Sequence, residues 1–171
     1  MSSFTKVALL LAGLALAGCD NSGVFGLDDT LGNDAATEAN YEQGSVDDPT
    51  SVAHFQQVVG DRVLFTVDQS DLTEDGKLVL LSQANWLLEN SAYNAVIEGH
   101  ADEQGTREYN LALGARRASA VKEFLVSRGI AGTRLRTVSY GKERPIEVCS
   151  AEACYAQNRR AVTILQADLS G

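Results

Sequence analysis

The chain has 171 residues and a formal net charge of −9 at neutral pH, which is enough length for one domain with a real core plus appendages. The charge is uneven. Residues 20–50 hold eight Asp or Glu residues and no Lys or Arg, whereas residues 51–171 hold 13 basic and 15 acidic residues. Because no basic patch or basic tail stands out, nothing favours a nucleic-acid partner.

The first residues have the pattern of an export signal. Lys6 precedes the apolar run "VALLLAGLALAG", which is too short to span a bilayer comfortably. The run ends in "LAGC", and a small residue at Gly18 directly before Cys19 resembles the lipobox of bacterial lipoproteins. The resemblance implies cleavage after Gly18 and a lipid on Cys19 that anchors the protein in a bilayer. The alternative is an ordinary signal peptide with an incidental cysteine.

The cysteine count agrees with a lipidated first cysteine. The chain has three cysteines, an odd number for an exported protein. If Cys19 carries lipid, Cys149 and Cys154 are left as a pair that an oxidising compartment can join as a disulfide. A metal site would need more ligands, and no histidine lies near this pair in the sequence.

Composition divides the chain into three parts. Residues 1–18 are the expected signal peptide, and residues 19–50 are expected to be the lipidated cysteine followed by a flexible, self-repelling acidic linker. Residues 51–171 change in texture and are expected to form the folded domain.

Hydrophobic periodicity predicts the elements of that domain. Strands are expected at Asp61–Val67, Tyr93–Gly99, Arg134–Gly141 and Arg159–Ala167, helices from Thr73 to Asn90 and from Thr106 to Gly129, and a short helix at Ser150–Gln157. The apolar stripe of the second long helix is expected at Leu111, Ala115, Ala118, Val121 and Leu125. This βαβαβ(α)β order predicts an α+β fold, a two-layer α/β sandwich with the helices on one face of a mixed sheet.

The sequence offers little for catalysis. It has no G-x-S-x-G, P-loop, H-E-x-x-H or dinucleotide-binding pattern, so we expect neither an enzyme nor a cofactor. His100 and Asp102 could suggest a metal pair, but two ligands are too few for a site. His100 is therefore interpreted as a strand-end histidine bonded to nearby backbone or to Glu98.

Asp102 and Arg117 are the most informative charged pair. Asp102 directly follows a predicted strand, and Arg117 lies three turns into the next helix, on the flank of its apolar stripe. Periodicity alone favours a salt bridge that pins the intervening loop. The alternative is that both groups are exposed and together bind a zwitterion. Arginine binds a carboxylate through two hydrogen bonds, and an acidic side chain binds an ammonium. Diaminopimelate in the stem peptide of peptidoglycan presents such a head group.

A family resemblance favours the second interpretation. The segment "IEGHADEQGTREYNLALGARRASAVKEFL" resembles the signature of the OmpA-like peptidoglycan-binding domain. The segments "VSYGKERP" and "AQNRRAV" are similar to later motifs of the lipoprotein branch of this family, which acts with the Tol system. The resemblance runs from about Asp61 to Leu165.

The resemblance implies a set of ligand-binding residues. Asp102 and Arg117 would hold the diaminopimelate head group, Asp68 would add a contact, and Leu113 would line the pocket. Tyr109 and Asn110 match the "YN" of the signature, and for Asn110 bracing of the helix start is the favoured role.

Two parts of the resemblance are less informative about ligand binding. Thr66 and Val67 depart from the usual family residues in the loop that contains Asp68. Arg159 and Arg160 match "NRR", where strand-flanking structure and contact with a ligand or partner are equally favoured.

The resemblance also implies a function. The protein would be an outer-membrane lipoprotein that tethers the membrane to peptidoglycan, with the periplasmic propeller protein of the Tol system as partner and a role in envelope integrity and cell division. Asp20, directly after the lipidated cysteine, is an inner-membrane retention signal in enteric bacteria and leaves that membrane as the alternative location. Alternative functions are a wall-associated enzyme and a purely structural lipoprotein.

Overall fold

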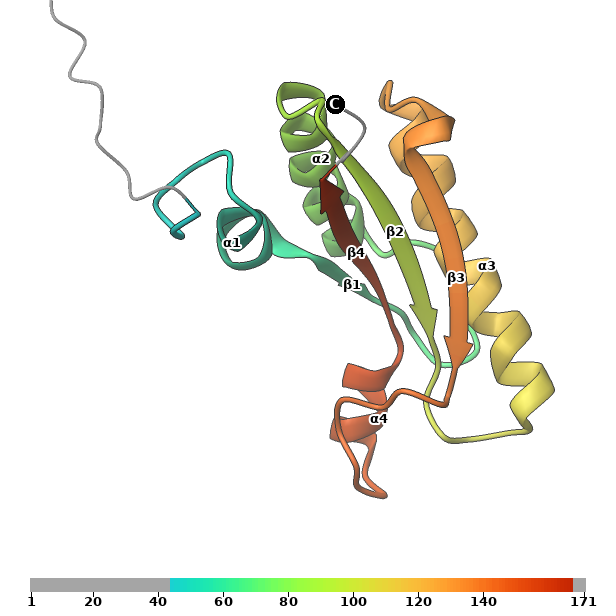
Figure 1. Ribbon diagram of the computed structural model, residues 1–171. Helices are drawn as coiled ribbons and strands as arrows, with labels where there is room; N and C mark the ends of the chain where they lie inside the picture. Colours follow the sequence, from blue (N-terminus) through green and yellow to red (C-terminus); the bar gives the residue numbers. More distant parts are fainter. Residues whose placement is uncertain (1–43, 168–171) are drawn as a thin grey trace, which may run out of the picture. The chain divides into compact units, whose positions relative to one another are not determined.

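The structure, a computed structural model, describes residues 44–167. In chain order its elements are α1 (Val52–His54), the π-helical turn η1 (Phe55–Gly60), β1 (Arg62–Leu64), α2 (Glu74–Glu89), β2 (Tyr93–His100), α3 (Arg107–Ser127), the 3-10 turn η2 (Gly132–Arg134), β3 (Leu135–Gly141), α4 (Glu152–Asn158) and β4 (Arg160–Ala167) (Figure 1). The expected signal peptide, the lipidation site Cys19, Asp20 and the expected linker up to residue 43 lie outside the described residues. The sequence pattern did not predict α1 and η1.

The four strands form one mixed sheet in the order β1-β4-β2-β3. β4 runs antiparallel to both β1 and β2, while β2 and β3 are parallel. α2 and α3 lie on the same face of this sheet, behind the strands as drawn in Figure 1. The predicted α+β fold, with two helices on one face of a mixed sheet, is confirmed.

Both long helices begin at a threonine cap. The Thr73 hydroxyl accepts a hydrogen bond from the Gly76 amide at 3.0 Å, and the Thr106 hydroxyl accepts one from the Tyr109 amide at 3.2 Å. Each cap satisfies an amide that the first helical turn leaves without a partner. Gly129, with φ of 100°, follows the end of α3, as the sequence predicted.

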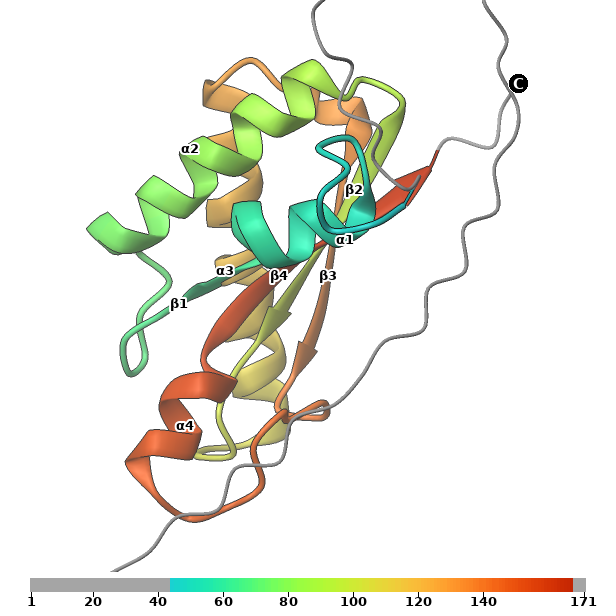
Figure 2. The ribbon, with the colours of Figure 1, turned by 90° about the vertical axis from the view of Figure 1, so that its left-hand side faces the viewer.

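The residues that directly precede Ser51 are already bonded to the domain. The Trp86 indole donates to the Pro49 carbonyl at 2.7 Å, and the Tyr93 hydroxyl donates to the Thr50 carbonyl at 3.2 Å. α1 continues into η1, and η1 lies beside α2, where Phe55 packs on Trp86 with ring centroids 4.9 Å apart (Figure 2). The chain therefore enters the domain beside the start of β2.

The buried face of α3 differs from the predicted stripe. Leu111 and Ala115 are exposed, and the helix instead turns Leu113, Gly114 and Arg117 inward, together with the expected Ala118, Val121 and Leu125. The reason is a close crossing at two glycines. A Cβ atom built on Gly99 of β2 would lie 1.8 Å from the Gly114 carbonyl oxygen, so only glycine fits there.

Within residues 44–167, no helix combines the length and the apolar character that a membrane crossing requires.

The close crossing of β2 and α3 makes Gly99 a test of the fold. We predict that Gly99→Ala lowers the free energy of unfolding by about 3 kcal/mol, because the new methyl group meets backbone rather than a side chain that can turn away. Urea denaturation followed by circular dichroism measures the change.

Gly132→Ala is the matched control, since a Cβ there meets only the Val126 side chain at 3.8 Å. Equal stability of the two variants would contradict the close packing of β2 against α3.

Candidate functional site

Asp102 lies in the loop that leaves the sheet at the end of β2. The preceding Ala101 amide donates to the Gly141 carbonyl at 2.8 Å, so the loop starts beside the end of β3. One carboxylate oxygen of Asp102 accepts a hydrogen bond from the Gln104 amide at 3.3 Å, and Gly105 turns the chain toward α3 with φ of 91°. The carboxylate is thus held by its own loop and is 8 % exposed.

The Arg117 side chain is completely buried, with 0 % exposure. Its guanidinium donates to three backbone carbonyls, those of Gln69 at 2.8 Å, His100 at 2.8 Å and Thr66 at 3.1 Å. It also lies over the Phe65 ring, 5.1 Å from the centroid. Burial lowers the pKa of Arg117 to about 10, so the group still carries its charge at neutral pH.

Asp102 and Arg117 are neighbours that do not form an ion pair. Among the described residues, the ion-pair partner of Asp102 is Arg159, at 3.1 Å. The Asp102 charge nevertheless is the strongest of those that favour the charged form of Arg117. The salt bridge that periodicity favoured is therefore wrong, and so is the expectation that both groups are exposed.

Arg159, which directly precedes β4, connects three parts of the site. Its guanidinium donates to Asp102, to Glu152 of α4 and to the Phe65 carbonyl at 3.3 Å. Burial works against its charge, but the hydrogen bonds that it donates to Glu152 and Asp102 outweigh this effect and raise the pKa of Arg159. The "NRR" signal pointed to this residue without fixing its role, which is contact with Asp102.

The other expected site residues lie on α3 and in the loop after β1. Tyr109 donates a hydrogen bond from its hydroxyl to Asp68 at 3.3 Å, and Asp68 adopts a φ of 55°, which is rare for a residue with a side chain. Leu113, one turn before Arg117 on α3, is 3 % exposed. Asn110 donates to the Gln104 carbonyl at 2.8 Å, which is the bracing contact that its position favoured.

His100 is a buried strand-end histidine. Its ring stacks on Tyr140 with centroids 5.7 Å apart, and Nε2 is 3.5 Å from a Glu98 carboxylate oxygen. Neither ring nitrogen has a hydrogen-bond partner among the described residues, so the expected bond to backbone or to Glu98 is wrong. Burial, helped by the positive charges of Arg160 and Arg144, lowers the pKa of His100 to about 4, so the ring is neutral at neutral pH. No group of three or more potential ligands gathers as a metal site in the described part of the chain.

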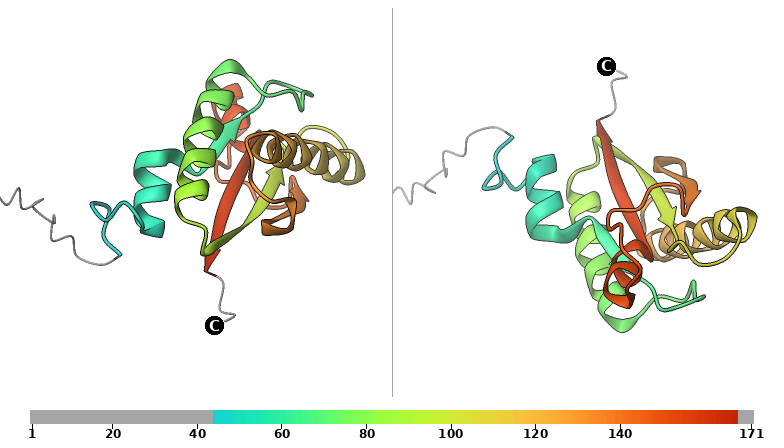
Figure 3. Two further views of the ribbon diagram at one scale, coloured as in Figure 1. Left: turned by 90° about the horizontal axis from the view of Figure 1, so that it is seen from above. Right: turned by 90° about the horizontal axis from the view of Figure 1, so that it is seen from below.

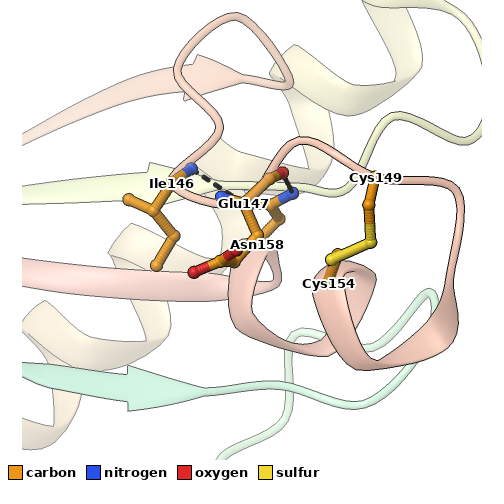
Figure 4. Close-up of a disulfide and its surroundings, with 5 residues drawn as sticks. All are labelled: Ile146, Glu147, Cys149, Cys154 and Asn158. Atoms are coloured by element: carbon orange, nitrogen blue, oxygen red, sulfur yellow. Dashed lines mark hydrogen bonds between the residues drawn. A yellow bond between two sulfur atoms is a disulfide. The ribbon is translucent and has the colours of Figure 1, made fainter.

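The segment before β4 is closed by a disulfide. Cys149 and Cys154 are joined, with Cα atoms 6.0 Å apart (Figure 4). The buried Asn158 side chain accepts hydrogen bonds from the amides of Ile146 and Glu147 and donates to the Glu147 carbonyl (Figure 4). α4 is thus fixed at both of its ends and lies at the end of the sheet where β2 stops (Figure 1); in the view from below it is nearest the viewer (Figure 3, right).

The site therefore presents a carboxylate beside a guanidinium at one end of the sheet. Each group is held by other partners, so neither neutralises the other. Such an arrangement can accept a ligand that carries both an ammonium and a carboxylate.

The sequence matches known proteins over most of its length. The OmpA family matches residues 64–159. A peptidoglycan-associated lipoprotein from Mesorhizobium japonicum is 49 % identical over 156 residues, which cover 91 % of this chain and 88 % of that protein. The protein of the same name from Haemophilus influenzae is 42 % identical and covers 95 % of this chain and 98 % of its own length.

A solved structure shares the fold. The crystal structure of the peptidoglycan-associated lipoprotein from Burkholderia pseudomallei superposes with a TM-score of 0.63 at 36 % sequence identity. The match covers 71 % of this chain and 98 % of that one.

The pKa of His100 tests whether its ring is buried beside the site as the structure shows. We predict that the His100 ring signal in NMR spectra of the folded protein titrates with a midpoint near pH 4, because the buried ring resists protonation. An unfolded histidine takes up its proton near pH 6.5. The protein should therefore lose stability as the pH falls from about 6.5 to about 4, where only the unfolded state binds this proton.

His100→Gln serves as the control and should lose less stability over the same pH interval. A His100 midpoint near 6.5 would show that the ring is not buried as described.

Proposed function

The chain belongs to the OmpA family, and we propose that it binds peptidoglycan non-covalently through the side-chain head group of diaminopimelate. Residues 1–18 would be the signal peptide, Cys19 the lipid anchor and residues 51–171 the binding domain. The protein would then act as a tether between a membrane and the cell wall.

One observation carries this proposal: the Asp102 charge acts on Arg117, yet each of the two groups is bonded to other partners. The head group of diaminopimelate has an ammonium and a carboxylate on one carbon atom. The Asp102 carboxylate would take the ammonium, and the Arg117 guanidinium would take the carboxylate.

The backbone carbonyls around Arg117 indicate how a ligand would enter. A ligand carboxylate offers two oxygens in one plane, which match the fork of a guanidinium better than two separate carbonyls do. It would replace the carbonyls of Thr66 and Gln69, which both belong to the loop after β1. Asp68 and Leu113 would complete the pocket around the ligand.

The remaining parts of the proposal come from the sequence and from the relatives. Lipid on Cys19 would fix the protein to the outer membrane, and we favour this location over the inner membrane despite Asp20. Because residues from Ser45 onward are bonded to the domain, about 25 residues of linker remain, which would reach on the order of 85 Å when fully extended. The periplasmic propeller protein of the Tol system would be the second partner, in a role that supports envelope integrity and cell division.

We predict that Asp102→Asn and Arg117→Lys each weaken binding to insoluble peptidoglycan sacculi by at least about thirtyfold, or about 2 kcal/mol. Asparagine keeps the shape of Asp102 but loses the charge that attracts the ammonium. Lysine keeps the charge of Arg117 but lacks the planar fork. Co-sedimentation of the protein with sacculi measures the binding, and analysis of the supernatant shows whether wall fragments are released.

Each variant has a matched control at the next exposed position. Glu103→Gln and Arg116→Lys make the same kinds of change on exposed side chains and should bind as the wild type does. Because Arg117 is buried, thermal denaturation of every variant is needed to separate lost binding from lost folding. Unchanged binding by Asp102→Asn would refute the proposed site, and released fragments would favour the alternative of a wall-associated enzyme.

A further inference from the structure

Asp102 is held in place by a single buried cation. The Arg159 guanidinium contacts one oxygen of the carboxylate at 3.1 Å, and both side chains are almost completely buried. The other oxygen accepts only the longer hydrogen bond from the Gln104 amide. Arg159 therefore fixes the direction in which the second oxygen can meet a ligand.

Arg159 is itself held by a carboxylate on the far side. Its second terminal nitrogen pairs with Glu152, which lies in the first turn of α4. We name these three residues the Asp102–Arg159–Glu152 network. In it the positive charge of Arg159 is shared between two acids, so that Asp102 keeps negative charge for a third group.

Glu152 owes its position to the disulfide. It lies between Cys149 and Cys154 in the sequence, inside the small loop that the disulfide closes. α4 has only seven residues, which is too short for a helix to be stable by itself. The disulfide and the Asn158 contacts therefore determine where Glu152 stands relative to Arg159.

We propose that Glu152 and Arg159 are positioning residues for ligand binding at Asp102. We also propose that the Cys149–Cys154 disulfide determines how firmly they hold Asp102 in its orientation. The inference rests on the proposed function, because it assigns Asp102 the task of holding the ligand's ammonium. Without Glu152, the positive charge of Arg159 interacts with Asp102 alone. Arg159 then competes with the ligand's ammonium for the Asp102 carboxylate and repels that ammonium.

The first test removes the outer acid. Glu152→Gln in the full mature chain, kept in detergent, should weaken binding to diaminopimelate-containing sacculi on the order of fivefold. Glu147→Gln is the matched control, because Glu147 is an exposed acid in the same segment whose side chain lies outside the network. It should bind as the wild type does.

The second test opens the disulfide. Dithiothreitol supplies two electrons and two protons, which give two thiols while the reagent closes to its own cyclic disulfide. The Cys149–Cys154 bond is accessible to it because Cys149 is exposed. Reduction should weaken binding by the wild type about as much as Glu152→Gln does, and should not weaken binding by Glu152→Gln further.

If the effects of reduction and of Glu152→Gln on binding do not add, the disulfide acts through Glu152 and not through the stability of the whole domain. If reduction weakens the wild type and Glu152→Gln by the same factor, the disulfide acts by another route and the inference is wrong. It is also wrong if neither change alters binding.

A measurement that needs no ligand distinguishes failure of this inference from failure of the proposed function. The 13C signal of the Asp102 carboxylate should move on reduction of the wild type and stay in place on reduction of Glu152→Gln. If sacculi bind neither the oxidised nor the reduced wild type, the proposed function fails. The carboxylate signal then still decides whether the disulfide and Glu152 position Asp102, and an unmoved signal overturns that part as well.

Discussion

The buried guanidinium of Arg117 is the constraint on which the site depends. A buried cation is costly unless it is paired or fully hydrogen-bonded, and here backbone carbonyls of Thr66, Gln69 and His100 supply the partners. Two of them come from the loop after β1 and one from the end of β2. Arg117 thus ties these segments to α3 and leaves Asp102 free to pair elsewhere.

The entry of the chain and the candidate site lie at opposite ends of β2. The chain enters beside Tyr93, and Asp102 follows two residues after His100, so roughly 25 Å of strand separates them. β2 is paired on both sides, antiparallel with β4 and parallel with β3. β2 is therefore held by hydrogen bonds along both edges over the distance between the two ends.

Local patterns in the sequence predicted the strands and the long helices but not α1 and η1, and they carried no information on long-range contacts. Period and capping residues located α2, α3 and the four strands, because these depend on neighbours a few residues away. The stripe of α3 was misplaced because its buried face contains Gly114 and Arg117, which no apolar pattern selects. The pairing of Asp102 with Arg159 joins residues 57 positions apart, and periodicity carries no information at that distance.

Recognition of an ammonium and a carboxylate on one carbon atom can be tested by changing the ligand. The affinity of the full mature chain should be measured for two preparations of sacculi, one with diaminopimelate and one with lysine in the stem peptide. Lysine keeps the ammonium but lacks the carboxylate that Arg117 would hold. We expect binding to the first and at least about thirtyfold weaker binding to the second. Equal affinity for both would contradict it.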